Sequence, residues 1–375
     1  MINNMKRTLF LLSACATLIL AACQREPRPA ETVPEGLPAE VTVRIDNAWT
    51  TRATDINYAD ESKVNTLQVF VFKGDDREAY RSVSQSLQAS VPATSGERTV
   101  WAVVNAPDLS DIMTLSALKD TETSLADNTL GSFVMTGSVI QELVDGGNVP
   151  ITVKRIVARV SLNKVSASLK DYRKDYSVRI EKLFLINVAA GNRYDVGGAP
   201  TTWENKAGHN DEVNDALLYE ALDNVIIRNN VYKKNGAPVD ENDAYDDSTH
   251  AIAEGVTVTK DNSYTKEHVF YTYPNPFPRS ESPDTYTPEW SPRGTLLVLE
   301  ARMFQGASDA EGIHGYYPII LPPLERNKAY IIEEVRITRL PGSEPFKPIE
   351  TGEAQVSITV CNWEIVLVNG GYVTI

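Results

Sequence analysis

An acidic run, Asp240–Asp247, holds the residues best suited to metal chemistry. Its sequence is DENDAYDD, and carboxylate oxygens of this kind are the ligands that calcium prefers. The run lacks the glycine turn and the bidentate glutamate of an EF-hand loop. A solvated acidic loop is therefore the favoured interpretation, and calcium binding stays open as the alternative. We predict no metal site.

Catalytic motifs are missing from the chain. It has no H-E-x-x-H, G-x-S-x-G, P-loop or G-x-G-x-x-G pattern. A Ser/His/Asp triad meets only in space, and nothing in the sequence favours one. The histidines stand singly, without the spacing of metal ligands, and each is expected to be solvated or structural: His209, His250, His268 and His314. We predict that the protein is not an enzyme and holds no cofactor.

The aromatic residues Tyr271, Tyr273 and Phe277 lie close together in sequence. Aromatic rings of this kind could line a sugar-binding surface. Packing inside a β-sandwich is the simpler interpretation, and it is the one that we favour.

The first residues predict export. Lys6 and Arg7 precede an apolar run, Thr8–Leu20, that is too short to span a bilayer. The run Leu20-Ala21-Ala22-Cys23 looks like a bacterial lipobox, which implies cleavage before Cys23 and lipid attachment to that residue. Residues 1–22 are then a lipoprotein signal peptide. An ordinary signal peptide with a chance cysteine is the alternative.

The other cysteines exclude an internal disulfide. Cys15 leaves with the signal peptide and Cys23 carries lipid, so only Cys361 remains. Cys361 lies in a strand-like run and is expected to be a small buried apolar residue.

The charge restricts the partners. The formal net charge of −14 and the pI near 4.9 argue against nucleic acid, whose phosphates would be repelled. They also argue against adhesion to anionic lipid through a basic patch.

The segment before the first domain combines a strand with a protease-accessible loop. Residues 24–38 have the Pro- and Glu-rich composition of a linker. In the following run, Glu40–Ile45, the apolar residues Val41, Val43 and Ile45 alternate with polar ones, which predicts a strand. A polar, turn-prone stretch follows and contains Arg52, where a protease could cut.

The rest of the chain predicts an all-β fold. Turn signals recur at short intervals, and no helix-period segment is long, which is typical of β-sandwiches. Strands are expected within 64–72, 99–105, 146–162, 178–188, 268–273, 294–303, 317–320, 331–338 and 355–360, with a short helix within 115–125.

The length and composition favour two domains. We predict two β-sandwiches of transthyretin-like or Greek-key type in tandem, with few short helices. A polar stretch near Lys170 marks the boundary, so the domains span 53–170 and 171–375, after a propeptide of residues 23–52 that contains the first strand.

The C-terminal segment is also strand-forming. Gln355–Val360 alternates, and the apolar run Ile365–Val368 follows it. Most domains end in segments that fray. Such a tail must pair within its own domain or be supplied to the sheet of another molecule.

The order of several short blocks resembles the Bacteroidales fimbrillins, the major fimbrial subunits of that group. The resemblance covers essentially the whole chain after the lipobox, except 187–262. The blocks are Asp60-Glu61-Ser62-Lys63-Val64 with LQVFVFKG, Gly96-Glu97-Arg98-Thr99-Val100, Met135-Thr136, Lys154-Arg155-Ile156-Val157-Ala158-Arg159, Glu181-Lys182-Leu183, Tyr316-Tyr317-Pro318, Glu325-Arg326-Asn327-Lys328-Ala329-Tyr330 and Trp363-Glu364-Ile365-Val366.

The resemblance implies polymerisation by strand exchange. A lipidated precursor reaches the outer membrane, and an arginine-specific, trypsin-like protease cuts after the first strand. The released strand, with Val41, Val43 and Ile45, leaves a groove for a neighbour's C-terminal strand. Cleavage is expected between Arg52 and Ala53, with Arg44 as the fallback. The expected donor residues are Val356, Ile358, Val360, Trp363 and Ile365.

The implied product is an extracellular fimbrium serving adhesion and biofilm formation. Its partners are identical subunits, accessory fimbrial subunits, and host or bacterial surface receptors. Two other interpretations remain: an accessory tip or anchor subunit, and a monomeric outer-membrane lipoprotein that binds glycan or protein. A secreted hydrolase has no support in the sequence.

Overall fold

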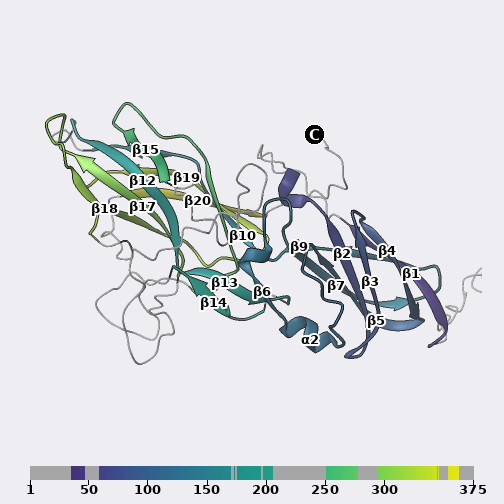
Figure 1. The fold of residues 1–375 in the computed structure, drawn as a ribbon. Coiled ribbons are helices and arrows are strands. Elements are labelled where there is room, and N and C mark those ends of the chain that lie inside the picture. Colours follow the sequence, from purple (N-terminus) through teal and green to yellow (C-terminus); the bar gives the residue numbers. More distant parts are fainter. Residues whose placement is uncertain are drawn as a thin grey trace, which may run out of the picture.

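The structure is a computed structural model that describes residues 35–46, 59–169, 173, 175–195, 197–205, 251–277, 294–343, 345 and 354–362. Their regular structure is almost entirely β-strand, which confirms the predicted all-β class. Two groups of sheets lie side by side, with a small sheet between them (Figure 1). None of the helices in this part of the chain is long and apolar enough to cross a membrane.

The first group consists of a three-stranded sheet, in the order β4-β1-β8, and a five-stranded sheet, in the order β3-β2-β5-β7-β9. An apolar cluster from both sheets forms their common core. The strands are β1 (Pro38–Asp46), β2 (Thr66–Lys73), β3 (Asp76–Ser84), β4 (Gln88–Thr94), β5 (Gly96–Val104), β7 (Met135–Leu143), β8 (Asn148–Thr152) and β9 (Lys154–Arg155).

Strand β2 is buried on both faces, which explains its apolar run Val69–Phe72. Val69 and Val71 belong to the core between the two sheets of the first group. Phe70 and Phe72 belong to a second, larger cluster that also contains Leu118. Leu118 lies in the short helix α2 (Leu115–Asp120), which falls within the predicted range 115–125. Two 3₁₀ helices accompany these elements, η1 (Ala59–Ser62) and η2 (Leu125–Asp127).

The second group consists of a sheet in the order β15-β12-β17-β18 and a sheet in which β19 pairs with β10, β11 and β20. Strand β16 completes the latter sheet beside β10. The strands are β10 (Ala158–Leu162), β11 (Val165–Ala167), β12 (Ser177–Ile186), β15 (Ala251–Val258), β16 (His268–Thr272), β17 (Leu296–Phe304), β18 (Ile313–Ile320), β19 (Lys328–Ile337) and β20 (Ala354–Asn362).

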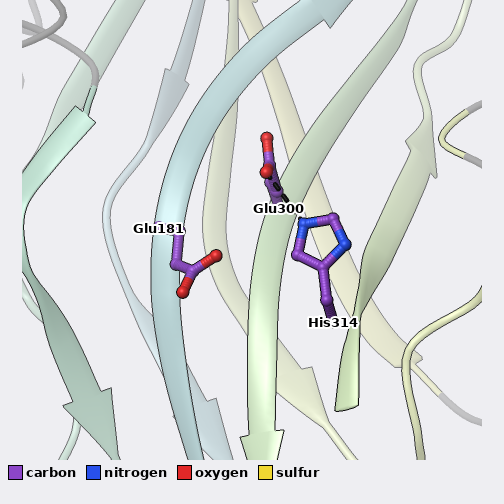
Figure 2. Close-up of side chains that lie close together, drawn as sticks. All are labelled: Glu181, Glu300 and His314. Carbon is purple, nitrogen blue, oxygen red and sulfur yellow. Dashed lines mark hydrogen bonds and ion pairs between the residues drawn. The ribbon is translucent and has the colours of Figure 1, made fainter. Parts of the chain in front are cut away.

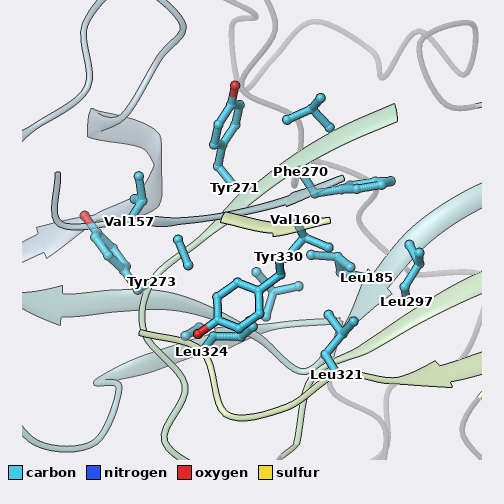
Figure 3. Packing of buried hydrophobic residues seen from close by; sticks show 14 of the residues in the cluster. Val157, Val160, Leu185, Phe270, Tyr271, Tyr273, Leu297, Leu321, Leu324 and Tyr330 are labelled. Atoms are coloured by element: carbon cyan, nitrogen blue, oxygen red, sulfur yellow. The ribbon is translucent and has the colours of Figure 1, made fainter. Parts of the chain in front are cut away.

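The larger apolar cluster fills the second group. Val160 of β10, Leu185 of β12, Leu297 of β17 and Tyr330 of β19 pack together in it (Figure 3). Every one of these side chains is at most 2% exposed. Apolar residues at alternate positions of facing strands thus form the core, as expected for packed sheets.

The small sheet joins segments from both sides of the predicted boundary at Lys170. Its order is β14-β13-β6, from strands β6 (Glu122–Ser124), β13 (Val188–Arg193) and β14 (Thr202–Glu204). Strands β10 and β11 also pair with β19 across that boundary. Because one apolar cluster includes residues of both groups, the division into two separate domains stays a prediction.

Candidate functional site

The first described strand lies in the middle of its sheet. Strand β1 pairs antiparallel with β4 along Pro38–Arg44 and parallel with β8 along Thr42–Asp46. Segments that follow it in sequence by about 50 and 100 residues therefore form its two neighbours. The predicted strand Glu40–Ile45 falls inside β1.

The inward face of β1 is fully buried. Val41 and Val43 are 0% exposed and Ile45 is 3% exposed. Ala39 occupies the preceding inward position and is 6% exposed. The three larger side chains contact the core between the two sheets, so removing β1 would open an apolar groove.

The walls of this groove come from β4 and β8. Ala89 and Val91 of β4 and Val149 and Ile151 of β8 are buried in the same core as β1. Val149 and Ile151 lie within the expected strand range 146–162, so that strand is confirmed, whereas no strand was expected around Ala89 and Val91. The alternation of Ala89, Val91 and Ala93 was the available signal for β4, but Pro92 in the same segment is unfavourable in a strand interior.

The outward face of β1 is polar and bonded to its neighbours. The Ser90 hydroxyl on β4 donates a hydrogen bond to the Glu40 carboxylate. The Glu40 backbone N–H donates to an Asp145 carboxylate oxygen at 3.0 Å. Thr42 is half-buried and Arg44 is exposed. The strand is thus apolar toward the core and polar toward solvent.

The two candidate cleavage sites have different surroundings. Arg44 lies within β1, opposite Gln88 of β4 and Pro150 of β8, so its backbone is flanked by strands on both sides. Arg52 and Ala53 lie outside the described residues, between the end of β1 at Asp46 and the start of η1 at Ala59. A cut in that segment would separate β1 covalently from the rest of the protein.

The segment after this gap is anchored by a buried charge network. In η1, Glu61 is 1% exposed, and its carboxylate accepts hydrogen bonds from Arg159 Nε at 3.3 Å and from the Tyr271 hydroxyl. Arg155 Nε donates to the Glu61 carbonyl at 2.8 Å. Arg159 also donates to Glu267 at 2.9 Å. The chain after the gap is therefore fastened between the two groups of sheets.

Several blocks of the sequence resemblance meet around this network. The side-chain oxygen of Asn327 accepts from the Arg155 backbone N–H at 3.3 Å. Arg326 donates to the Lys154 carbonyl at 2.7 Å and to the Thr136 hydroxyl at 2.9 Å. In the part of the chain that the structure describes, these blocks hold together segments that lie far apart in sequence. Their role there is therefore structural.

The last described strand lies at a sheet edge among the described residues. Strand β20 pairs antiparallel with β19, with Val356 opposite Val335, Ile358 opposite Ile332 and Val360 opposite Tyr330. Within the described ranges, no strand pairs with its other edge. Ile358 packs against the larger cluster.

Other predicted site residues fall outside the part that the structure describes. They are Cys23, Trp363, Ile365 and the acidic run 240–247, together with His209 and His250. Cys361 lies in β20 opposite Ala329, and nothing is described of its side chain.

The aromatic candidates belong to the core. Tyr271 and Tyr273 are 0% exposed, and the Tyr273 hydroxyl donates to the Ser124 carbonyl at 2.7 Å. Phe277 is half-buried, and its ring centroid lies 6.0 Å from that of Trp203. The packing interpretation is confirmed for the two tyrosines.

Two of the predicted single histidines are described. His268 is buried, and its Nε2 lies 2.6 Å from the Tyr264 hydroxyl. Burial, together with the charge of Lys266, lowers the pKa of His268 to about 4, so the ring is neutral at pH 7. His268 is therefore structural, as predicted.

His314 belongs to a cluster with Glu181 and Glu300, on three adjacent strands (Figure 2). Their ligand atoms lie within 4.8 Å of one another. Arg179 and Arg302 bind the Glu181 carboxylate at 2.7 and 3.2 Å. Burial raises the pKa of Glu181, but the hydrogen bonds from both arginines outweigh it and lower the pKa below its usual value. Since cations already neutralise this carboxylate, the cluster is a surface ion-pair network.

Comparison with solved structures finds relatives of similar fold. A solved fimbrilin from Porphyromonas gingivalis W83 has a similar fold, with a TM-score of 0.56 and 17% sequence identity. That likeness covers 88% of this chain and 98% of the fimbrilin.

The family comparison is more specific. Residues 39–179 match the family of the major fimbrial subunit protein (FimA), and the match begins at Ala39, in β1. The major fimbrium subunits FimA type-2 and type-3 of Porphyromonas gingivalis are each 26% identical over 204 residues, or 48% of this chain. The alignment spans 52% of the length of each relative. The predicted resemblance to the Bacteroidales fimbrillin family is therefore confirmed.

Proposed function

We propose that this protein is a structural fimbrial subunit that polymerises by protease-triggered strand exchange. The observation that carries the proposal is the position of β1, which is central in its sheet, buried on its inward face and joined to the rest of the chain through the segment that contains Arg52. The similarity to major fimbrial subunits supports the same assignment.

The covalent link explains why the precursor stays closed. While β1 remains attached, its high effective concentration lets it outcompete any strand from another molecule. A cut after Arg52 removes that advantage. A groove without a strand exposes unpaired backbone groups and apolar surface, so a donor strand from a neighbour is then bound favourably.

The cleavage would fall at Arg52 rather than Arg44. A protease binds its substrate as an extended, accessible segment, whereas the backbone around Arg44 is paired with strands on both sides. Cleavage after Arg52 also removes a lipid carried by Cys23. The precursor is then an outer-membrane lipoprotein, and the product is an extracellular fimbrium of identical subunits with accessory subunits.

The test uses lipid-free precursor that begins at Gln24, treated with an arginine-specific, trypsin-like protease. We expect a single cut after Arg52, followed by an SDS-resistant ladder of oligomers in unboiled samples. Arg52→Lys should abolish both the cut and the ladder. Arg44→Lys is the matched control, and it should leave both unchanged.

Other outcomes assign other roles. A cut without a ladder would indicate an accessory tip or anchor subunit. If the protein is folded and Arg52 still resists cleavage, the proposal is contradicted. The better interpretation is then a monomeric surface lipoprotein that binds glycan or protein.

A further inference from the structure

The first and last described strands share a seven-residue pattern. Residues 39–45 of β1 read AEVTVRI, and residues 354–360 of β20 read AQVSITV. The apolar residues stand at the same four positions in both segments. Two of the polar positions also keep their character, with Glu40 matched by Gln355 and Thr42 by Ser357.

The inward-facing residues of β1 and the corresponding residues of β20 have the same composition. The inward residues of β1 are Ala39, Val41, Val43 and Ile45, and all four are buried. The corresponding residues of β20 are Ala354, Val356, Ile358 and Val360. Each set contains one alanine, two valines and one isoleucine, so the total side-chain volume is equal. Volume-conserving exchanges of this kind are the best tolerated in a packed core.

The outward positions fit as well. The Ser90 hydroxyl donates to the Glu40 carboxylate, and the side-chain carbonyl of Gln355 is an acceptor of similar reach. The bond to Asp145 comes from the backbone N–H at position 40, which any residue except proline supplies.

We propose that residues 354–360 of a second copy replace residues 39–45 position for position and in the same direction. The donor would then be antiparallel to β4 and parallel to β8, as β1 is. This inference rests on the proposed strand exchange and specifies the register and orientation of the donor strand.

The position of the alanine, first in both segments, determines the orientation of the donor strand in the groove. In the reverse orientation Val360 would occupy the space of Ala39, and Ala354 would occupy the space of Ile45. The first change overpacks its site and the second leaves a cavity, and both are unfavourable in a close-packed core.

The later C-terminal residues match less well. In the run 363–368, WEIVLV, one face would place Trp363 at the alanine position, and the other would place Glu364 there. Residues 354–360 therefore fit the groove better than this run, although Trp363 and Ile365 were also among the expected donor residues.

The exchange also increases backbone pairing. In its own chain β20 has one neighbour, β19, among the strands that the structure describes. In the groove it would lie between β4 and β8 and pair along both edges, as β1 does. A strand held along one edge is the easier one to detach, and it gains a second ladder of hydrogen bonds on transfer.

The test is disulfide mapping in the assembled polymer. Gln88 is exposed and lies opposite Arg44 in the β1–β4 register, so it should lie opposite Thr359 of the donor. Residues directly opposite in antiparallel strands are close enough for a disulfide. Gln88→Cys is combined in turn with Thr359→Cys, Ser357→Cys or Gln355→Cys, in lipid-free precursor that carries Cys361→Ser.

Only the Thr359→Cys pair is expected to form disulfide-linked oligomers, and only after cleavage. Before cleavage Thr359 lies opposite Ile331 of its own β19. A disulfide link through Gln355→Cys would show that the donor strand runs in the reverse direction. A link through Ser357→Cys would show that its register is shifted by two residues. Either result would overturn the inference and leave strand exchange intact.

Two further outcomes separate the inference from the proposed function. If an SDS-resistant ladder forms but none of the three pairs links, the donor lies elsewhere and the inference is wrong. If the unsubstituted protein is cut and forms no ladder, strand exchange itself fails. As a measurement that needs no substitution in the subunit, a peptide of residues 354–362 with Cys361→Ser should block the ladder, whereas its reversed sequence should not.

Discussion

At the scale of single residues, Thr42 and Val43 are neighbours with opposite environments. Val43 is fully buried in the core of the first group, and Thr42 is half-buried on the outward face of β1. Alternation along a strand produces this difference. The energy that holds β1 in its groove should therefore come from every second residue.

Alanine substitutions at these two positions test this. Val43→Ala should lower the free energy of unfolding of the precursor by about 2 kcal/mol, because it removes two buried methyl groups and leaves a cavity. Thr42→Ala should cost less than about 0.5 kcal/mol. Urea unfolding followed by tryptophan fluorescence measures both values. Equal losses would contradict the assigned inward face.

At the scale of elements, the walls of the groove need support beyond β1. Among the strands that the structure describes, β4 and β8 pair with β1 alone, so they lose that pairing when β1 leaves. Glu78 of β3 holds β4 in place, because its carboxylate accepts hydrogen bonds from the Thr94 hydroxyl at 2.6 Å and from Arg98 Nε. This link should help to keep the empty groove open.

The Glu78 link predicts a pH dependence. Burial raises the pKa of Glu78, but the hydrogen bonds from Thr94 and Arg98 and the charge of Arg98 outweigh it, so the pKa is lowered from 4.5. A depressed carboxyl pKa stabilises the folded state above the pKa of the unfolded chain, and this contribution is lost as the pH falls through the folded-state value. Stability should therefore fall less steeply below pH 4.5 in Glu78→Gln than in the unsubstituted protein.

Urea midpoints measured at neutral and acidic pH check this expectation. The matched control is Glu97→Gln, which alters an exposed carboxylate on β5, a strand of the same sheet. Its acid sensitivity should equal that of the unsubstituted protein. An unchanged pH dependence in Glu78→Gln would mean that this carboxylate does not hold the wall.

At the scale of the whole molecule, the strong excess of negative charge, −14 in the full sequence, opposes association of identical subunits. After cleavage, the rate of oligomer formation should rise several-fold between about 20 and about 200 mM NaCl, because salt screens the repulsion. Light scattering measures this rate, and sucrose at matched osmolarity is the control. A rate that falls with salt would indicate that complementary charged faces guide assembly.

Much of the fold could be predicted from local patterns. Alternation predicted β1 and β19, and the apolar run in β2 predicted a core strand, because side-chain periodicity reflects which face is buried. Strands β3 and β7 were missed. Each has exposed or half-buried residues along most of its length, so its sequence is polar and carries little periodicity.

The sequence by itself determined the β-rich class, the resemblance to fimbrillins and the matching residues 39–45 and 354–360, because these depend only on the type and order of residues. The tertiary structure decided that β1 lies between β4 and β8, that Glu61 anchors the segment that begins at Ala59, and that β20 pairs with β19 alone among the described strands. These features depend on pairing between segments far apart in the chain. Such pairing is decided by the packing of the whole core, so no local pattern encodes it.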